Sequence, residues 1–250
     1  MVADAGSIEE ILAAMQERLD TLPANRVSQR IFLDTYRRTT AAVGLAVGRS
    51  TFEDPDWVER WDVVFAELYL RALDADLAGS GLVPRPWRLA FSAPASLPPL
   101  RHVLLGINAH INYDLPQALI AVISPEDFAD RRIVESRSRD HERIDAVLSG
   151  RVAAEDGELS AMGRPSLLDR ALTPLNRVAS KRFLREARQK VWHNTKELNR
   201  ARLAGPDALE RRLFELEVLS AARIADLLAP GQVLLRLSVS GFGVVLPPPA

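Results

Sequence analysis

A polar run interrupts an otherwise apolar segment of the chain and is its first candidate for a chemical site. Residues 100–115 read LRHVLLGINAHINYDL, and the polar run extends from Asn108 to Asp114. Apolar residues recur on every side of this segment, which is typical of the central helix of a bundle. Because an unpaired polar group costs about 1–3 kcal/mol to bury, the run requires a polar network, a ligand or a metal ion.

The spacing within the run divides it into two faces. At about 100° per residue, His110 and Asp114 lie one turn apart on one face. Asn108 and Asn112 lie one turn apart on a nearly opposite face. A carboxylate one turn after a histidine holds the imidazole in one tautomer and raises its basicity, which suits a general base or a metal ligand. We therefore predict that His110 and Asp114 form the site, and that the two asparagines either bind substrate or form a structural bracket.

Two further histidines are followed by an acid at the same spacing, His141 by Asp145 and His193 by Glu197. Side chains four residues apart on a helix face each other. His141 lies on the apolar stripe of its predicted helix, whereas His193 lies in a polar stretch where exposed pairs contribute little. The sequence therefore favours His141 as a third catalytic residue beside the pair on the polar run, and favours an exposed surface pair at His193.

The predicted site also includes polar and aromatic residues on the polar run and on neighbouring helices. As substrate-binding residues we predict His102, Asn108, Asn112, Tyr113, Trp61, Tyr69 and Asp140. If a metal ion is bound, its expected ligands are the three predicted catalytic residues, His110, Asp114 and His141. The chain has no HExxH and no Glu-x-x-His pattern, so a divalent metal stays an open alternative. No nucleotide cofactor is expected, because no glycine-rich loop stands between a strand and a helix.

These residues lead to three hypotheses for the function. The first is an enzyme that acts on a small, partly apolar molecule in a pocket inside a helical bundle, by His/Asp acid–base or metal-assisted chemistry. The second is a metal-free lyase, isomerase or cyclase. The third is a non-catalytic ligand-binding or structural protein with a buried polar network. The sequence does not decide whether the protein is an enzyme, and it determines neither the reaction nor the substrate.

The elements that must position these residues are helices, because the apolar periodicity is helical along most of the chain. Helix-start signals stand at Ser7 with Glu10, at Asp54-Pro55 and at Ser124-Pro125. We predict an all-α, single-domain multi-helix bundle over residues 1–250, with a central buried helix around residues 100–115. The predicted helices cover roughly 7–21, 25–47, 54–79, 100–123 with a kink at Pro116, 124–148, 166–172, 174–203 and 206–228. The predicted irregular segments are a loop over 82–99 with one helical turn near 87–91, a mobile loop over 149–165 and an extended tail over 233–250.

Composition limits the classes of partner. The formal net charge is −1, which gives no field that favours nucleic acid or an anionic membrane. The chain contains no cysteine, which excludes disulfides and thiolate chemistry. The N-terminus has no signal-peptide pattern, and no apolar stretch reaches the roughly 18 residues of a membrane helix, so we expect a cytoplasmic protein. The expected partner is a small-molecule substrate or ligand, with no nucleic acid and no membrane, and the oligomeric state is not determined.

The polar run also carries a family resemblance. The block HVLLGINAHINYDL (102–115) resembles the hallmark of the DUF5995 family, a group of helical proteins common in actinobacteria. The similarity extends to WDVVFAELYLRALD (61–74) and RDHERIDAVL (139–148), and therefore covers most of the chain. The resemblance implies a helical fold and carries no activity to transfer. By implication the hallmark positions are His102, Asn108, His110, Asn112 and Asp114, with His141 in the later block.

Overall fold

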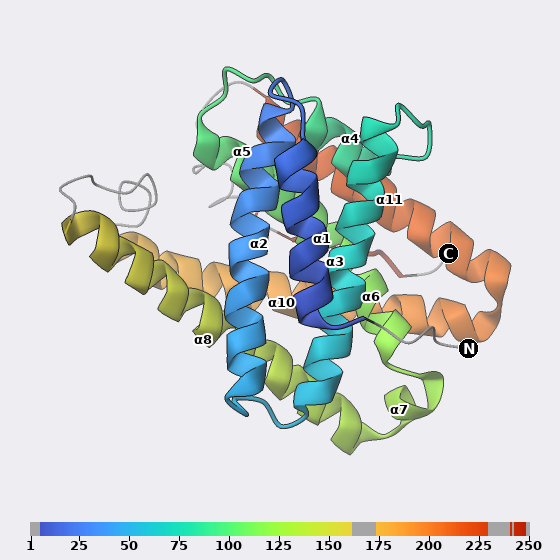
Figure 1. Cartoon of the computed structure of the whole chain (residues 1–250). Coiled ribbons are helices and arrows are strands. Elements are labelled where there is room, and N and C mark those ends of the chain that lie inside the picture. The colour runs from blue at the N-terminus through green and yellow to red at the C-terminus, as the bar shows by residue number, and fades with distance from the viewer. Residues whose placement is uncertain (1–5, 162–173, 230–240, 242, 249–250) are drawn as a thin grey trace.

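The computed structural model describes residues 6–161, 174–229, 241 and 243–248, and the regular secondary structure of these residues is entirely helical. The side chains at 100, 145, 148–161 and 174–185 lie outside the description. The predicted all-α class is confirmed. Figure 1 shows α1, α2 and α3 side by side, with α8 and α10 crossing them on one side and α4 near α11.

The first three helices begin where the sequence predicts. Helix α1 (Ile8–Thr21) starts with a capping box, in which Ser7 Oγ accepts from the Glu10 N–H and the Glu10 carboxylate accepts from the Ser7 N–H. Helix α2 (Val27–Gly48) follows, and α3 (Pro55–Leu77) starts at Asp54, whose carboxylate accepts from the Trp57 N–H. The three helices pack on one another, and α2 and α3 supply most of the aromatic core.

The central segment is brought against α2 by a glycine. Helix α4 (Arg85–Phe91) leads to α5 (Pro99–Ala109), which packs on α2. A Cβ added at Gly106 would lie 2.2 Å from Cδ2 of Phe32, so only glycine permits this approach. The approach places the end of α5 beside the α2 rings.

The polar run does not continue as an α-helix. His110–Asp114 forms a π-helical turn, η1, and the Leu115 N–H donates to the His110 carbonyl five residues back. Helix α6 (Leu115–Val122) then begins with Pro116 in its first turn. Proline has no N–H to give to the carbonyl four residues back and its ring crowds that carbonyl, which disfavours a continuous α-helix here. A π turn therefore stands where the sequence predicts a kink.

Two predicted boundaries are wrong in the next segment. The predicted helix over 124–148 is two helices, α7 (Pro125–Ala129) and α8 (Arg131–Ala161). The extended backbone of Asp130 separates the two helices. The Asp130 carboxylate accepts from the Arg132 N–H at the start of α8. The predicted mobile loop over 149–165 is also wrong for residues 149–161, which continue α8. The high helix propensity of the alanine, arginine and glutamate residues in this stretch outweighs the low helix propensity of its two glycines, which suggested a loop.

The C-terminal part consists of two long helices and an extended segment. Helices α10 (Pro174–Ala204) and α11 (Pro206–Leu228) pack on each other, close to their predicted bounds. The predicted helix over 166–172 and most of the predicted tail lie outside the described residues. Residues 243–248 run along α10, where Asn194 accepts from the Leu246 N–H and donates to the Val244 carbonyl. The single-domain organisation stays a prediction.

Candidate functional site

A buried polar contact in the core joins the two residues that the sequence favours. His110 Nδ1 lies 2.9 Å from Oδ2 of Asp114, and Trp87 Nε1 donates to the same oxygen at 2.8 Å. Both residues of the pair are buried, with 3% and 1% of their surface exposed. An indole N–H can only donate. With Asp114 as a carboxylate that accepts from both rings, His110 carries its proton on Nδ1 and Nε2 is left as a base.

Aromatic rings from three helices surround His110. The Phe65 ring of α3 stacks on the imidazole with centroids 3.5 Å apart and planes within 5°. Tyr36 of α2 meets it edge-on at 4.5 Å, and Tyr69 of α3 lies at 6.1 Å. Phe32 and Trp87 complete the enclosure at 6.0 and 5.9 Å. We call these five rings with His110 and Asp114, together with Asp62, whose charge acts on Tyr36, the His110 cluster.

Several polar atoms of the His110 cluster are buried without a hydrogen-bond partner among the described residues. They are His110 Nε2, Tyr36 Oη, Tyr69 Oη and Asp62 Oδ2. Buried polar groups in folded proteins are normally paired, and each unpaired one costs on the order of 1–3 kcal/mol. Four of them in one cluster therefore indicate that the cluster is built for more than packing.

Burial sets the protonation states in the His110 cluster. Desolvation raises the pKa of the Asp62 carboxyl to about 7, and the neighbouring Glu59 adds to the shift. Desolvation lowers the pKa of His110, although Asp114 opposes this, and it raises the pKa of Asp114. The pKa of Tyr36 is raised well above its usual value by burial and by the charge of Asp62. Near neutral pH the cluster thus combines a neutral imidazole with a carboxyl that is close to its midpoint.

Sequence reasoning missed Asp62, Tyr36, Phe65 and Trp87. The available signal for Asp62 was an acid between the apolar residues Trp61 and Val63. Such an acid is buried only at a cost, so its position in the chain already indicates a special environment.

The asparagine pair, predicted either to bind substrate or to form a structural bracket, has hydrogen bonds within the chain. Asn112 Nδ2 donates to Asn108 Oδ1 at 3.1 Å, and Asn108 Nδ2 donates to the Leu104 carbonyl. Asn112 Oδ1 also accepts from the Val244 N–H at 3.3 Å. The pair therefore ties η1 to the C-terminal segment on the side away from the His110 cluster.

His102 and Asp140 also have structural partners. His102 Nδ1 lies 2.9 Å from the Ser28 hydroxyl and joins α5 to α2. Asp140 accepts from the N–H groups of Glu53 and Asp54 at 2.7 and 2.9 Å, and from Arg143. Asp140 thus holds the turn before α3.

His141 does not join His110 in one site. Its ring lies edge-on to Trp61 at 5.2 Å and 5.9 Å from Trp192 of α10, and Trp61 stacks on Phe65 between the two histidines. Within the described part of the chain, no three His, Asp or Glu side chains could hold a metal ion, so His110, Asp114 and His141 do not form the predicted metal site. The Asp145 side chain lies outside the described residues.

The predicted aromatic residues are dispersed. Tyr69 joins the His110 cluster, whereas Trp61 lies between that cluster and His141. Tyr113 packs in a second apolar cluster with Leu216 and Leu246, and burial raises the pKa of its hydroxyl. Only one of the three is therefore placed to contact a molecule at His110.

His193 lies outside the His110 cluster, as predicted, but the expected exposed pair with Glu197 is wrong. His193 bonds to the Leu246 carbonyl at 3.0 Å. Glu197 is buried and pairs with Arg212 of α11. The packing of α11 and the C-terminal segment on α10 therefore gives each residue a partner from elsewhere in the chain.

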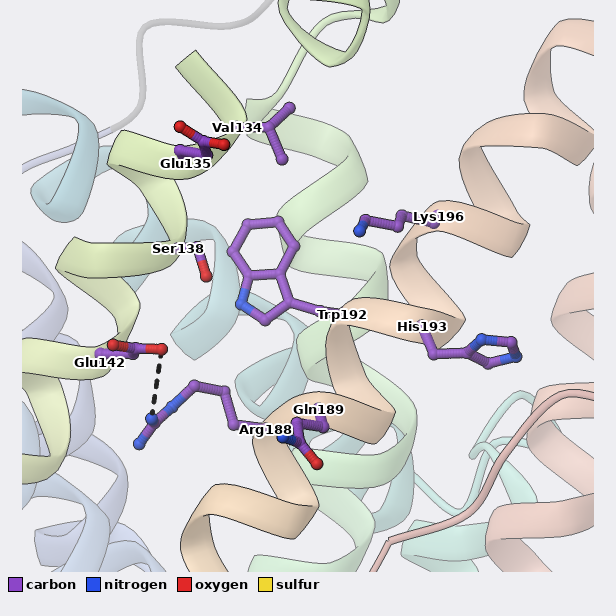
Figure 2. Close-up of a pocket in the computed structure, with 9 residues that line it drawn as sticks. All are labelled: Val134, Glu135, Ser138, Glu142, Arg188, Gln189, Trp192, His193 and Lys196. Atoms are coloured by element: carbon purple, nitrogen blue, oxygen red, sulfur yellow. Dashed lines mark ion pairs between the residues drawn. The ribbon is translucent and has the colours of Figure 1, made fainter. Parts of the chain in front are cut away.

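A groove opens between α8 and α10 (Figure 2), and its Trp192 ring lies 5.9 Å from the ring of His141. Its volume is about 700 Å³, within the range of small-molecule sites. Trp192 lies at its centre, with Ser138 and Glu142 on the α8 wall and Arg188 and Lys196 on the α10 wall. We call it the α8–α10 groove. Sequence reasoning did not find it, because its two walls are far apart in the chain.

The fold and site thus define an all-α protein with a buried His–Asp pair enclosed by aromatic rings. The model of a family of unknown function, DUF5995, matches residues 8–230, and the chain belongs to this family. No curated protein and no solved structure matches the chain. Among the described helices, none is long and apolar enough to cross a membrane.

Proposed function

We propose that this protein is a metal-independent proton-transfer enzyme that acts on a small, neutral, partly apolar molecule in the His110 cluster. One observation carries the proposal. The cluster contains a histidine whose Nε2 has no hydrogen-bond partner among the described residues, and Tyr36 connects it to Asp62, a carboxyl with a pKa of about 7. A neutral imidazole and a carboxyl that is partly protonated near pH 7 can act as the general base and the general acid of one reaction.

The proposed roles follow from the contacts. His110 Nε2 takes a proton from the substrate, while Asp114 accepts the Nδ1–H and stabilises the imidazolium that forms. Asp62, which is protonated below its pKa of about 7, gives a proton to a second substrate atom. The hydroxyls of Tyr36 and Tyr69 donate hydrogen bonds to substrate oxygen. The substrate keeps its charge, so the reaction class is an isomerisation or an elimination.

The surroundings of His110 support a small and neutral substrate. Rings enclose the imidazole, and burying a charged molecule among them would cost far more than burying a neutral one. The unpartnered atoms have almost no exposed surface, so the helices around the cluster must separate for a molecule to reach them. The expectations of a cytoplasmic location, a small-molecule partner and no nucleic-acid or membrane partner remain part of this proposal.

Solvent deuterium provides a test in which the substrate need not be identified beforehand. The purified protein is incubated in D₂O with a protein-free small-molecule extract, and mass spectrometry follows which compounds gain deuterium or change isomer. We expect at least one compound to gain deuterium with the wild-type protein and not with His110→Gln. His193→Gln is the matched control, because His193 contacts the C-terminal segment and lies outside the His110 cluster.

A second variant separates catalysis from folding. Tyr36→Phe removes a hydroxyl that has no hydrogen-bond partner among the described residues, although Thr40 lies close enough to influence its pKa. The variant should therefore leave stability unchanged or slightly increased. Under the proposal it slows deuterium gain by at least tenfold. If no compound gains deuterium with the wild-type protein, or if His110→Gln and Tyr36→Phe retain the activity, the cluster is a structural network and the third hypothesis replaces the proposal.

A further inference from the structure

The floor of the α8–α10 groove contains a buried polar atom without a hydrogen-bond partner among the described residues. Trp192 is only 7% exposed, and its indole N–H has no partner among the described residues. In Figure 2 the nitrogen-bearing edge of the indole faces α8, on the side of Ser138. A buried donor directed into a groove costs free energy unless a ligand accepts from it. The groove therefore differs from an accidental surface depression.

The two walls of the groove carry opposite charges. Glu135 and Glu142 project from α8, and Arg188 and Lys196 project from α10 (Figure 2). One ion pair spans the groove and joins Arg188 Nη1 to Glu142 Oε1 at 3.9 Å, which is beyond hydrogen-bond distance. An acidic wall thus faces a basic wall across the floor.

Arg188 supplies a largely buried cation at the edge of the floor. Its side chain is 12% exposed, and burial lowers the pKa of its guanidinium. The same positive charge contributes to the lowered pKa of His141 below the floor. Glu142 has 58% of its side chain exposed, so solvent weakens its attraction for Arg188. A ligand carboxylate in the groove would bring a second negative charge to this cation.

We propose that the α8–α10 groove binds a zwitterionic, amino-acid-like molecule with an apolar body. The ligand carboxylate lies on the basic α10 wall, its ammonium lies on Glu142, and its side chain packs on Trp192 and Val134. The indole N–H of Trp192 donates to a ligand oxygen. A simple anion is disfavoured because the acids of α8 repel it, and a simple cation is disfavoured by the basic wall of α10. This inference is independent of the reaction proposed for the His110 cluster.

Three compounds with the same ring but different charges test the charge pattern. Calorimetric titration near neutral pH compares L-phenylalanine, 2-phenylethylamine and 3-phenylpropionate. We expect L-phenylalanine to bind at least tenfold more tightly than either singly charged analogue. Equal binding of the three compounds, or no binding of L-phenylalanine, would overturn the proposal.

Variants locate the site. Glu142→Gln should reduce the preference for L-phenylalanine over 3-phenylpropionate at least severalfold, and Trp192→Phe should weaken L-phenylalanine binding while keeping a ring in the floor. Glu67→Gln is the matched control, because Glu67 pairs with Arg71 on the surface of α3. His110→Gln should leave binding unchanged. If His110→Gln abolishes binding and Glu142→Gln does not, the compound occupies the His110 cluster and the groove proposal fails.

Discussion

His110 and His141 are both buried and both contact the aromatic residues of α3, but their surroundings differ in one respect. His110 has a carboxylate on Nδ1, contributed by Asp114 from the same turn. His141 has Trp61 and Trp192 as ring neighbours, and the charge of Arg188 adds to its desolvation. Burial lowers the pKa of both, and for His141 the value falls to about 3. Under the proposed function, the Asp114 carboxylate suits His110 for proton transfer, whereas burial and the charge of Arg188 keep His141 neutral.

The largest effect should come from removing the carboxylate that distinguishes the two regions. Asp114→Ala leaves the N–H groups of His110 and Trp87 unpaired in the core, so we expect a loss of about 3–5 kcal/mol in the free energy of unfolding. Asp114→Asn keeps an acceptor oxygen and should cost only about 1–2 kcal/mol. Urea denaturation measures both. The control is Asp74→Ala, which breaks an exposed pair with Arg18, and an equal loss in that variant would contradict the assignment.

The next effect is a loss of stability in acid that depends on His141. Its pKa of about 3 lies below the ordinary value of 6.5, so its stabilising contribution is complete above pH 6.5 and is lost progressively as the pH falls toward 3. Between neutrality and about pH 4.5 this amounts to roughly 2–3 kcal/mol. His141→Leu should lack that part of the acid sensitivity in urea denaturation, and His193→Gln should retain it. Equal acid sensitivity of His141→Leu and wild type would show that His141 is not kept neutral by burial.

Asp62 should respond to pH with the opposite sign. Its pKa is raised to about 7, so its contribution to stability is complete below pH 3.8 and is lost as the pH rises through 7. Asp62→Asn removes the buried charge, so we expect its free energy of unfolding to gain on that of wild type by about 4 kcal/mol between pH 4 and pH 8. Thermal and urea denaturation across this range measure the difference. The exposed Asp20→Asn variant should show no such trend, and a flat profile for Asp62→Asn would refute the raised pKa.

The smallest effect on stability is expected in the α8–α10 groove. Glu142→Gln removes one partner of an ion pair that is 3.9 Å apart and exposed on the Glu142 side, so the free energy of unfolding should change by less than about 0.5 kcal/mol. Thermal denaturation tests this. A change above about 1 kcal/mol would mean that Glu142 is part of the folding core and not a free wall of a binding groove.

Much of the fold followed from local signals. Ser7 with Glu10, and Asp54 with Pro55, fixed two helix starts because capping depends on neighbouring residues alone. The break at Asp130 was missed because Ser124 and Pro125 give an equally good start for a long helix, and only the packing of α7 and α8 decides where it ends.

The candidate site was also predictable only in part. The contact of His110 with Asp114 was predictable because both residues lie on one turn. The convergence of His141 on that pair was predicted and does not occur, because Trp61 and Phe65 stand between the two histidines. Tyr36 was missed because its contact with His110 joins α2 to the central segment, and Asp62 was missed because its effect on Tyr36 depends on how α2 and α3 pack.

The sequence by itself determined that the protein is all-α, that the central segment is buried, and that His110 and Asp114 form a pair within it. These features depend on periodicity, capping and spacing along one helix. Only the tertiary structure decided which rings enclose the pair, that Asp62 is buried beside Tyr36, and that α8 and α10 form a groove over Trp192. The physical reason is that burial and the pKa shifts it causes depend on residues from separate helices, whose contacts no local pattern specifies.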